Sequence, residues 1–171
     1  MFFNPTTLNE STTDSPVPDL DIRRYTPADF TDLVAMYSAY SPAEQTLGSP
    51  PLSSDRLTSW LESLLAEGEH WLAVTDDIIG HLSLLPITED RAELAIYIHP
   101  EYLNRGIGTA LCECALTEGL ERYETIWLVV ERSNLPAMIL FENVGFEVID
   151  RTRGEHEMEC RQDGGASVAE V

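Results

Sequence analysis

The chain has 171 residues, a length typical of one domain that can bury a sizeable hydrophobic core. Its 30 acidic residues against 10 basic ones give a net charge of −20, and every basic residue is an arginine. A surface this acidic repels the phosphates of nucleic acids and anionic membranes, so we expect neither as a partner. No apolar run approaches the ~20 residues of a membrane span, and residues 1–20 lack a basic region followed by an apolar one. We therefore expect a cytoplasmic protein.

Two explanations compete for the acidic charge. It could attract cationic substrates, or it could be an adaptation to molar salt, where a Debye length of ~3 Å screens repulsion within the chain. The acidic residues are scattered along the whole sequence rather than clustered, which favours a halophilic-type acidic surface. The charge then says little about the substrate.

The three cysteines give no sign of a metal site. Cys112 and Cys114 lie two apart in a predicted helix and so point in different directions, and Cys160 is remote in sequence. No histidine pair supplies ligands nearby. We expect buried thiols in a reducing compartment and no bound metal.

The first half of the chain begins with a segment rich in Thr, Ser, Asn and Pro, which predicts a mobile tail at residues 1–18. A single domain is expected at residues 19–161, and a disordered tail at 162–171. The predicted elements in chain order are a strand at 21–25, a helix opened by Thr26 and Pro27, a loop at 41–52, a helix capped by Ser53 or Ser54, and strands at 71–74 and 78–85.

The second half predicts a strand at 94–98, a helix from Ile107 to a stop at Gly119, a strand at 126–130, a helix capped by Ser133 or Asn134, and strands at 146–151 and 156–161. The apolar face of the first of these helices should carry Ile107, Ala110, Leu111, Cys114 and Ala115. Three successive strands should pair antiparallel, and the strand–helix–strand crossover after them should be parallel. This order predicts an α/β (α+β) fold with a mixed sheet and helices on both faces.

Residues 93–109 contain the most informative pattern. The apolar run 94–98 stops at His99-Pro100, because proline cannot continue a sheet ladder. A short loop then brings Arg105-Gly106-Ile107-Gly108 to the start of a helix. Glycines let backbone N–H groups approach a ligand closely, and the helix N-terminus adds partial positive charge. The pattern predicts a strand, an anion-binding loop and a helix.

This element order and two motifs resemble the acetyl-CoA-dependent N-acetyltransferase (GNAT) superfamily. The family's loop, Gln/Arg-x-x-Gly-x-Gly/Ala, is similar to the stretch Leu103-Asn104-Arg105-Gly106-Ile107-Gly108, which has leucine at the first position. The family's second signature resembles Asn134-x-x-Ala137-x-x-Leu140-Phe141-Glu142-x-x-Gly145-Phe146. Together the matches cover roughly residues 20–160. The resemblance implies a mostly antiparallel sheet whose fourth and fifth strands splay apart.

The resemblance also implies a function, the transfer of an acetyl group from acetyl-CoA to a primary amine by direct attack. The expected cofactor-binding residues are Ile96 and Ile98, whose backbone would meet the pantetheine arm, the loop residues Arg105, Gly106, Ile107, Gly108 and Thr109 at the pyrophosphate, and Asn134 beside the arm. The amide of Ile98 would lie near the thioester carbonyl, where negative charge develops. Glu93 is the candidate general base.

One position departs from the family pattern. Many members have a tyrosine in the second signature that protonates the leaving thiolate, and this chain has Phe141 there. A positioned acid supplies about 10²-fold in rate, so catalysis is weakened rather than excluded. The substitutes considered are Tyr97, Tyr102, Tyr123 and water, while His81 and His99 are alternative bases.

Two other functions and the acceptor stay open. A dinucleotide-binding oxidoreductase also begins with a strand, a Gly-x-Gly loop and a helix, but Leu111 stands where its third glycine should be. A non-catalytic acyl-CoA-binding sensor or partner module is suggested by Leu103 and Phe141. Among acceptors, protein N-termini or side chains, polyamines, amino acids and aminoglycosides are all compatible with the sequence, as is a homodimer.

Overall fold

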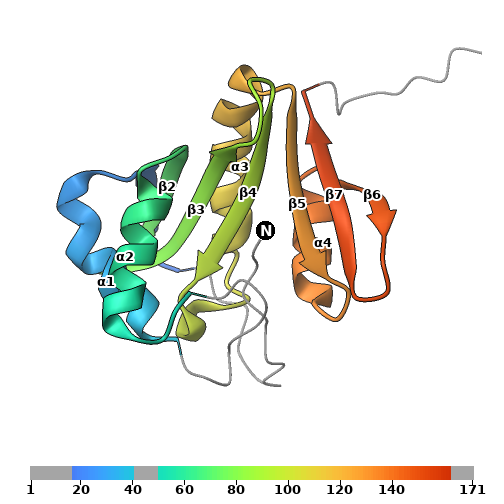
Figure 1. The fold of residues 1–171 in the computed structure, drawn as a ribbon. Helices are drawn as coiled ribbons and strands as arrows, with labels where there is room; N and C mark the ends of the chain where they lie inside the picture. The colour runs from blue at the N-terminus through green and yellow to red at the C-terminus, as the bar shows by residue number, and fades with distance from the viewer. Residues whose placement is uncertain (1–16, 41–49, 163–171) are drawn as a thin grey trace, which may run out of the picture.

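The computed structural model describes residues 17–40 and 50–162, which form a seven-stranded sheet with helices on both faces (Figure 1). The first half contains β1 (Asp21–Arg24), the short 3-10 turn η1 (Pro27–Asp29), α1 (Phe30–Ser38), α2 (Ser54–Leu65), β2 (Glu69–Val74) and β3 (Ile78–Pro86). The second half contains β4 (Arg91–Ile98), the 3-10 turn η3 (Pro100–Tyr102), α3 (Ile107–Arg122), β5 (Thr125–Glu131), α4 (Leu135–Asn143), β6 (Glu147–Arg151) and β7 (Glu155–Arg161).

The strands and helices expected from the sequence are present, with some ends displaced. β2 begins at Glu69 and β4 at Arg91, both earlier than predicted. The predicted stop of α3 at Gly119 is wrong, because the helix continues to Arg122. Gly119 is instead buried against the sheet, where an added β-carbon would lie 2.5 Å from Cδ1 of Leu84. This glycine permits close packing and does not end the helix.

The buried face of α3 is also rotated from the predicted one. Ile107, Leu111 and Ala115 are buried as expected, and Leu116 is buried with them. Cys112 and Cys160 are buried thiols, whereas Cys114 is only half-buried, so the expectation of three buried cysteines is wrong for Cys114. Among the described residues, no cluster of His, Cys, Asp and Glu side chains could hold a metal ion.

The expected tails and the loop at 41–52 fall mostly outside the described residues. Of the tails, only Val17, Pro18 and Gln162 are described. Val17 packs against the core, and the amide of Gln162 donates to the carbonyl oxygen of Glu124 over 3.2 Å. In the parts of the chain that the structure describes, no helix has the length and apolar character needed to cross a membrane.

The sheet has the strand order β1-β2-β3-β4-β5-β7-β6, in which β4 and β5 are parallel and the other neighbours antiparallel. The β3–β4 ladder runs from Gly80 opposite Ile98 to Pro86 opposite Ala92. The β4–β5 ladder is much shorter and ends where Glu93 lies opposite Trp127. Beyond that rung the two strands diverge (Figure 1). The predicted mixed, mostly antiparallel sheet with a splayed fourth and fifth strand is therefore confirmed.

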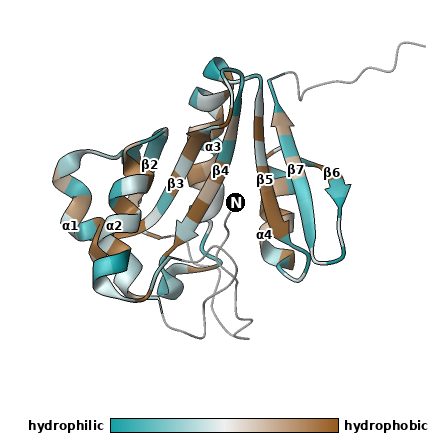
Figure 2. Cartoon of the chain, in the orientation of Figure 1, coloured by the Kyte–Doolittle hydropathy of each residue, from teal (hydrophilic) through white to brown (hydrophobic). Residues whose placement is uncertain are grey.

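Two hydrophobic clusters cover the two faces of the sheet. The larger one packs α3 and α4 against the side chains of β4 that include Leu94 and Ile96. The smaller one packs α1 and α2 against the opposite face, through Ala95 and Tyr97 of the same strand. Side chains alternate between faces along a strand, so both clusters meet at β4. Figure 2 shows the apolar residues concentrated in the strands and on the sides of the helices that face them.

Candidate functional site

The loop between η3 and α3 presents a helix N-terminus toward open space. Gly106, the N-cap residue of α3, has a φ of 79°, a left-handed conformation that glycine adopts without strain. The first bond within the helix runs from the amide of Ala110 to the carbonyl oxygen of Gly106 over 3.1 Å. The amides of Ile107, Gly108 and Thr109 precede that bond and have no partner within the helix, so they can bind an anion.

Arg105 adds a positive charge to the same loop. Its guanidinium carbon lies 5.3 Å from the centroid of the Tyr102 ring, an arrangement that orients the side chain. Its Nε is buried and has no hydrogen-bond partner among the described residues. A buried N–H without a partner is costly, so this donor suits a ligand with anionic oxygens.

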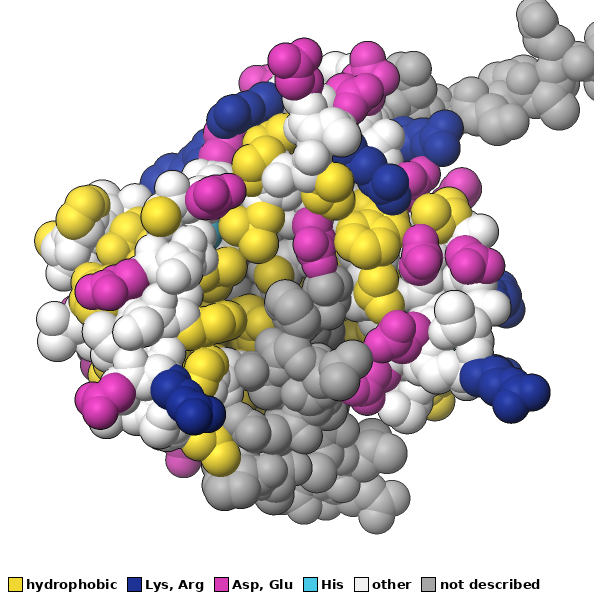
Figure 3. Space-filling view, in the orientation of Figure 1, with side chains coloured by type: hydrophobic (Ala, Val, Ile, Leu, Met, Phe, Trp, Pro, Cys, Tyr) yellow, Lys and Arg dark blue, Asp and Glu magenta, His cyan; other side chains and the backbone are white. Residues whose placement is uncertain are grey.

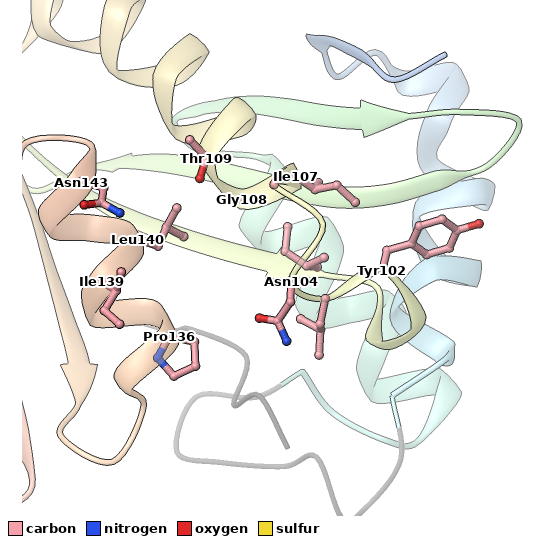
Figure 4. Close-up of a pocket in the computed structure, with 12 residues that line it drawn as sticks. Tyr102, Asn104, Ile107, Gly108, Thr109, Pro136, Ile139, Leu140 and Asn143 are labelled. Atoms are coloured by element: carbon pink, nitrogen blue, oxygen red, sulfur yellow. The ribbon is translucent and has the colours of Figure 1, made fainter. Parts of the chain in front are cut away.

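A pocket opens at this loop and is closed on its far side by α4 (Figure 4). The predicted residues Ile98, Gly106, Ile107, Gly108 and Thr109 line it. Residues that we did not predict complete the lining, namely Tyr102, Leu103, Asn104, Pro136, Ile139, Leu140 and Asn143. Of the two exposed hydrophobic residues on α4, Ile139 at 57% lines this wall and Leu135 at 62% does not, so no simple sequence signal identified the wall.

Gly108 has a packing role as well as a place in the loop. A β-carbon there would lie 2.9 Å from Cδ2 of Leu140, so α3 and α4 approach closely at this point. Ile96 is fully buried beneath the pocket and is not in its lining. Asn134 is also outside the lining, and its side chain accepts a hydrogen bond from the amide of Ala137 over 3.3 Å. That contact is the helix-capping role expected for Asn134.

The backbone of Ile96 and Ile98 faces the gap between β4 and β5. The amide of His99 donates to Ile79 of β3 over 2.8 Å. Along an antiparallel strand, residues whose backbone bonds to the neighbouring strand alternate with residues whose backbone groups point the other way. Because His99 bonds to β3, the backbone groups of Ile98 and Ile96 point toward β5. A ligand lying in the gap would therefore meet the backbone of these two residues. The carbonyl oxygen of Ile98 also accepts a hydrogen bond from the hydroxyl of Tyr40 over 2.6 Å.

Glu93 lies at the point where the two strands separate. It is the third residue of β4 and is opposite Leu85 on β3 and Trp127 on β5. Its side chain shares a sheet face with Ala95 and Tyr97, the face that α1 and α2 cover, because alternate residues of a strand point the same way. Glu93 is half-buried and belongs to the rung where the two strands separate.

The tyrosines considered as acids occupy different parts of the molecule. Phe141 is core, as expected, with its ring 5.5 Å from that of Phe146. Tyr123 caps the C-terminal end of α3, a helix of 16 residues, and so lies on the order of 20 Å from the loop at its other end. Tyr102 lines the pocket at the loop.

His81 lies in a buried chain of polar groups on the α1 and α2 side. The Tyr37 hydroxyl is 2.7 Å from Nδ1 of His81, and Nε2 of His81 is 3.1 Å from Nδ1 of His70. Nε2 of His70 lies 2.7 Å from the carbonyl oxygen of Glu67, which can only accept, so that nitrogen carries the hydrogen. Neutral rings then satisfy every link, with Tyr37 donating to His81 and His81 donating to His70.

Burial lowers the pKa of both histidines, that of His81 most strongly, which keeps them neutral near pH 7. His81 therefore has both ring nitrogens engaged and is poorly placed to be a base. The other alternative base, His99, begins η3, where its Nδ1 accepts from the amide of Glu101 over 3.2 Å and its ring contacts Tyr102. His99 has a local capping role.

Comparison with known proteins connects this geometry to a family. The model of the acetyltransferase (GNAT) family matches residues 33–146. A [ribosomal protein bS18]-alanine N-acetyltransferase of Escherichia coli is 35% identical over 94 residues, which are 51% of this chain and 64% of that protein. The chain therefore matches less than two thirds of the length of this curated relative.

Solved structures share the fold. An acetyltransferase of the GNAT family from Streptococcus pneumoniae superposes with a TM-score of 0.69 at 21% identity, covering 83% of this chain and 98% of that one. A putative acetyltransferase from Salmonella typhimurium, solved with its cofactor acetyl-CoA, superposes with a TM-score of 0.67 at 17% identity, covering 90% of this chain and 99% of that one. At these identities the likeness concerns the fold.

Proposed function

Because the chain belongs to the acetyltransferase (GNAT) family, we propose that it transfers an acetyl group from acetyl-CoA to a primary amine by direct attack. One observation carries the proposal. The ladder between β4 and β5 ends at Glu93, and the strands diverge toward a pocket whose other end is the N-terminus of α3. A single extended ligand can therefore place an anionic group on the helix and a reactive group beside a carboxylate.

The residues present fit acetyl-CoA. The unpaired donor on Arg105 and the first amides of α3, at Ile107, Gly108 and Thr109, would hold the pyrophosphate. The apolar wall of α4 and the backbone edges of Ile96 and Ile98 would hold the pantetheine arm. Asn134 is proposed at the same arm from the family pattern, in addition to its capping bond. Bound acetyl-CoA supplies the activated acetyl group.

The chain's own groups would prepare the amine and stabilise charge. A primary ammonium with a pKa near ~10.4 cannot attack until it loses a proton, and Glu93 would accept that proton. The amide of Ile98, which faces the gap, would donate to the oxygen on which negative charge develops. Both groups belong to β4, five residues apart, which is about 16 Å along an extended strand, so the proton would reach Glu93 through water molecules.

We propose a primary amine of a small molecule, a peptide N-terminus or a peptide side chain as the acceptor. The similarity to an enzyme named for the alanine of ribosomal protein bS18 supports testing a peptide with N-terminal alanine first. We also propose a cytoplasmic location, which the three free cysteines support because such thiols persist in reducing compartments.

The test is the release of free thiol from acetyl-CoA, measured with an N-terminal alanine peptide, a lysine peptide and spermidine, at low and at molar salt. We expect amine-dependent thiol release and a product heavier by one acetyl group in mass spectrometry. Binding of acetyl-CoA without turnover on any amine would favour the sensor alternative. The oxidoreductase alternative already conflicts with the sheet, which has one parallel pair where a dinucleotide-binding fold is mostly parallel.

A further inference from the structure

The proposed reaction needs a proton for its leaving group, and the family position cannot supply it. Acetyl transfer to an amine breaks the carbon–sulfur bond of the thioester and releases the thiol as a thiolate unless an acid donates a proton. Phe141 has no acidic proton and is buried in the core against Phe146. Of the tyrosines considered from sequence, Tyr123 lies at the opposite end of α3 from the loop.

Tyr40 brings a hydroxyl to the gap from the other side of the sheet. It follows the end of α1, where its amide donates to the carbonyl oxygen of Tyr37 over 3.3 Å. Its side chain is 6% exposed, and its hydroxyl donates to the carbonyl oxygen of Ile98 over 2.6 Å. The amide and carbonyl of one strand residue point to the same edge, so this hydroxyl lies beside the Ile98 amide.

We propose that Tyr40 is the general acid of the reaction, replacing the tyrosine absent at position 141. This inference rests on the proposed acetyl transfer. As the carbon–sulfur bond breaks, the sulfur keeps the bonding electrons and takes the phenolic proton of Tyr40, leaving a thiol and a phenolate. The amine has meanwhile lost one proton to Glu93. After the attack the nitrogen still has a second proton to lose. Transfer of that proton through water to the Tyr40 phenolate leaves the neutral amide and restores the phenol, and water removes the first proton from Glu93, so protons balance over a turnover.

The hydrogen bond to Ile98 suits this role. It fixes the Tyr40 hydroxyl at the edge that also carries the proposed oxyanion donor, which is where the leaving sulfur must lie, since sulfur and oxygen share one carbonyl carbon. A carbonyl acceptor holds the phenol without taking its proton. Apo catalytic hydrogen bonds commonly rearrange when the substrate is bound, so a bond to Ile98 is compatible with donation to sulfur.

The contacts of the neighbouring tyrosines favour Tyr40 over them as the general acid. Tyr37 on α1 stacks against it with ring centroids 6.2 Å apart, but the Tyr37 hydroxyl is committed to His81 on β3. Tyr97 on β4 has its ring among those of Tyr37 and Trp60. Burial raises the pKa of Tyr97 well above its ordinary value, and its ring packs into the cluster under α1 and α2, whereas the hydrogen bond to the Ile98 carbonyl oxygen belongs to Tyr40.

The pH dependence of turnover tests the proposal. A tyrosine acid makes kcat fall when the pH exceeds the pKa of its hydroxyl, near ~10 for an ordinary tyrosine. We expect Tyr40→Phe to lower kcat by about 10²-fold near neutral pH and to abolish the fall at high pH. Acetyl-CoA affinity in calorimetry should hardly change. Tyr37→Phe is the matched control, because it removes a buried hydroxyl three residues earlier in the chain and should lower stability while keeping the fall of kcat at high pH.

Two further variants distinguish a general-acid role of Tyr40 from a purely structural role. Phe141→Tyr should restore part of the lost kcat in the Tyr40→Phe background, which a structural role for Tyr40 does not predict. A fluorinated tyrosine at position 40, whose hydroxyl is more acidic, should move the high-pH limb to lower pH. A wild-type enzyme that turns over while Tyr40→Phe keeps both its rate and its high-pH limb would overturn the inference and leave the acetyl transfer intact. Loss of the limb in Tyr97→Phe instead would assign the acid to Tyr97.

Discussion

At the scale of single residues, Glu93, the proposed general base, has a defined place on β4. It occupies the last rung of the β4–β5 ladder, opposite Trp127, so its carboxylate lies where the strands separate. The same strand turns the Ile98 amide toward the gap, five residues further along. A carboxylate and a backbone donor on one strand are fixed relative to each other without any loop movement.

Glu93→Gln should therefore lower kcat by roughly 10²- to 10⁴-fold near neutral pH, because glutamine keeps the shape but cannot accept the proton. The loss should shrink at high pH, where more of the amine is already deprotonated, and acetyl-CoA affinity should hardly change. Steady-state kinetics across pH and calorimetry measure the two effects. Glu89→Gln, an exposed acid in the β3–β4 turn, is the control. A Glu93→Gln enzyme with wild-type turnover at every pH would place the base elsewhere.

The buried histidines make stability depend on pH. Burial lowers the pKa of His70 and His81 in the folded state, so the unfolded chain binds their protons first as the pH falls. The stability of the neutral form is complete above the unfolded pKa of ~6.5 and declines below it, by up to about 1.4 kcal/mol per pH unit for each histidine. At lower pH, protonation of Asp29 adds to the loss, because the Arg23 guanidinium holds the pKa of that carboxyl well below its ordinary value.

Thermal unfolding measured between pH 8 and pH 5 at constant molar salt should show Tm falling on the acidic side of about pH 6.5. His70→Gln should reduce the slope of stability against pH between 6.5 and 5, because glutamine does not titrate. A Tm that stays constant from pH 7.5 to pH 5.5 in the wild-type protein would mean that the buried histidines do not control stability in this range.

At the scale of elements, glycines set how closely α3 approaches its neighbours. Gly108 lies against Leu140 of α4 near the loop, and Gly119 lies against Leu84 and Ile126 of the sheet near the other end. A β-carbon added at either glycine would lie less than 3 Å from a carbon atom of the neighbouring leucine. A substitution at Gly108 would disturb the α3–α4 contact as well as the loop before α3, so a variant at this position would test packing and ligand binding together.

Gly119→Ala should destabilise the protein even though alanine is the better helix former by about 1 kcal/mol. Its β-carbon would lie 2.5 Å from Cδ1 of Leu84 and 3.0 Å from Cδ1 of Ile126, and both side chains are 0% exposed, so neither has room to move. Overpacking of this kind costs about 1–3 kcal/mol. We expect a Tm lower by about 2–8 °C in calorimetry. Gly154→Ala, where an added β-carbon meets nothing within 4 Å, is the control and should leave Tm within a degree or two, roughly the ±0.5 kcal/mol of an ordinary surface change. A Gly119→Ala protein more stable than wild type would mean that Leu84 and Ile126 can make room.

At the scale of the whole molecule, the charge is the dominant property. With 30 acidic residues and 10 arginines, arginine pairing cannot neutralise most carboxylates. Figure 3 shows acidic side chains spread over the visible face rather than gathered on one element. Ion pairs between partly exposed side chains, such as Arg24 with Glu118 at 2.6 Å, each contribute little, and the bidentate pair of Arg23 with the buried Asp29 is an exception.

Salt should therefore stabilise the fold. Self-repulsion within a chain of net charge −20 is strong when screening is weak and is largely removed when the Debye length falls to ~3 Å at 1 M. Tm measured in NaCl and in KCl should rise between about 0.05 M and several molar, and similarly in the two salts, since screening depends on ionic strength. A Tm independent of salt would favour the alternative explanation, in which the acidic surface serves to attract a cationic substrate.

The sequence alone predicted the secondary-structure elements better than it predicted the contacts of individual side chains. Local signals were sufficient for the strands, for the helix caps at Ser53 and Asn134, and for the glycine turn that starts α3 at Ile107, because periodicity, capping and glycine conformation involve residues close in sequence. The family pattern added the splay of β4 and β5. These signals name the cofactor end of the site.

Other features of the molecule depend on contacts between residues far apart in the chain. No local pattern distinguishes Gly119 as a packing glycine from a helix stop, because the reason lies in Leu84 on another strand. Nothing near Tyr40 in the sequence indicates that its hydroxyl reaches the carbonyl of Ile98, 58 residues away. The same holds for His81, whose partners come from α1 and β2. Sheet register and helix packing bring these groups together, and they are properties of the folded chain.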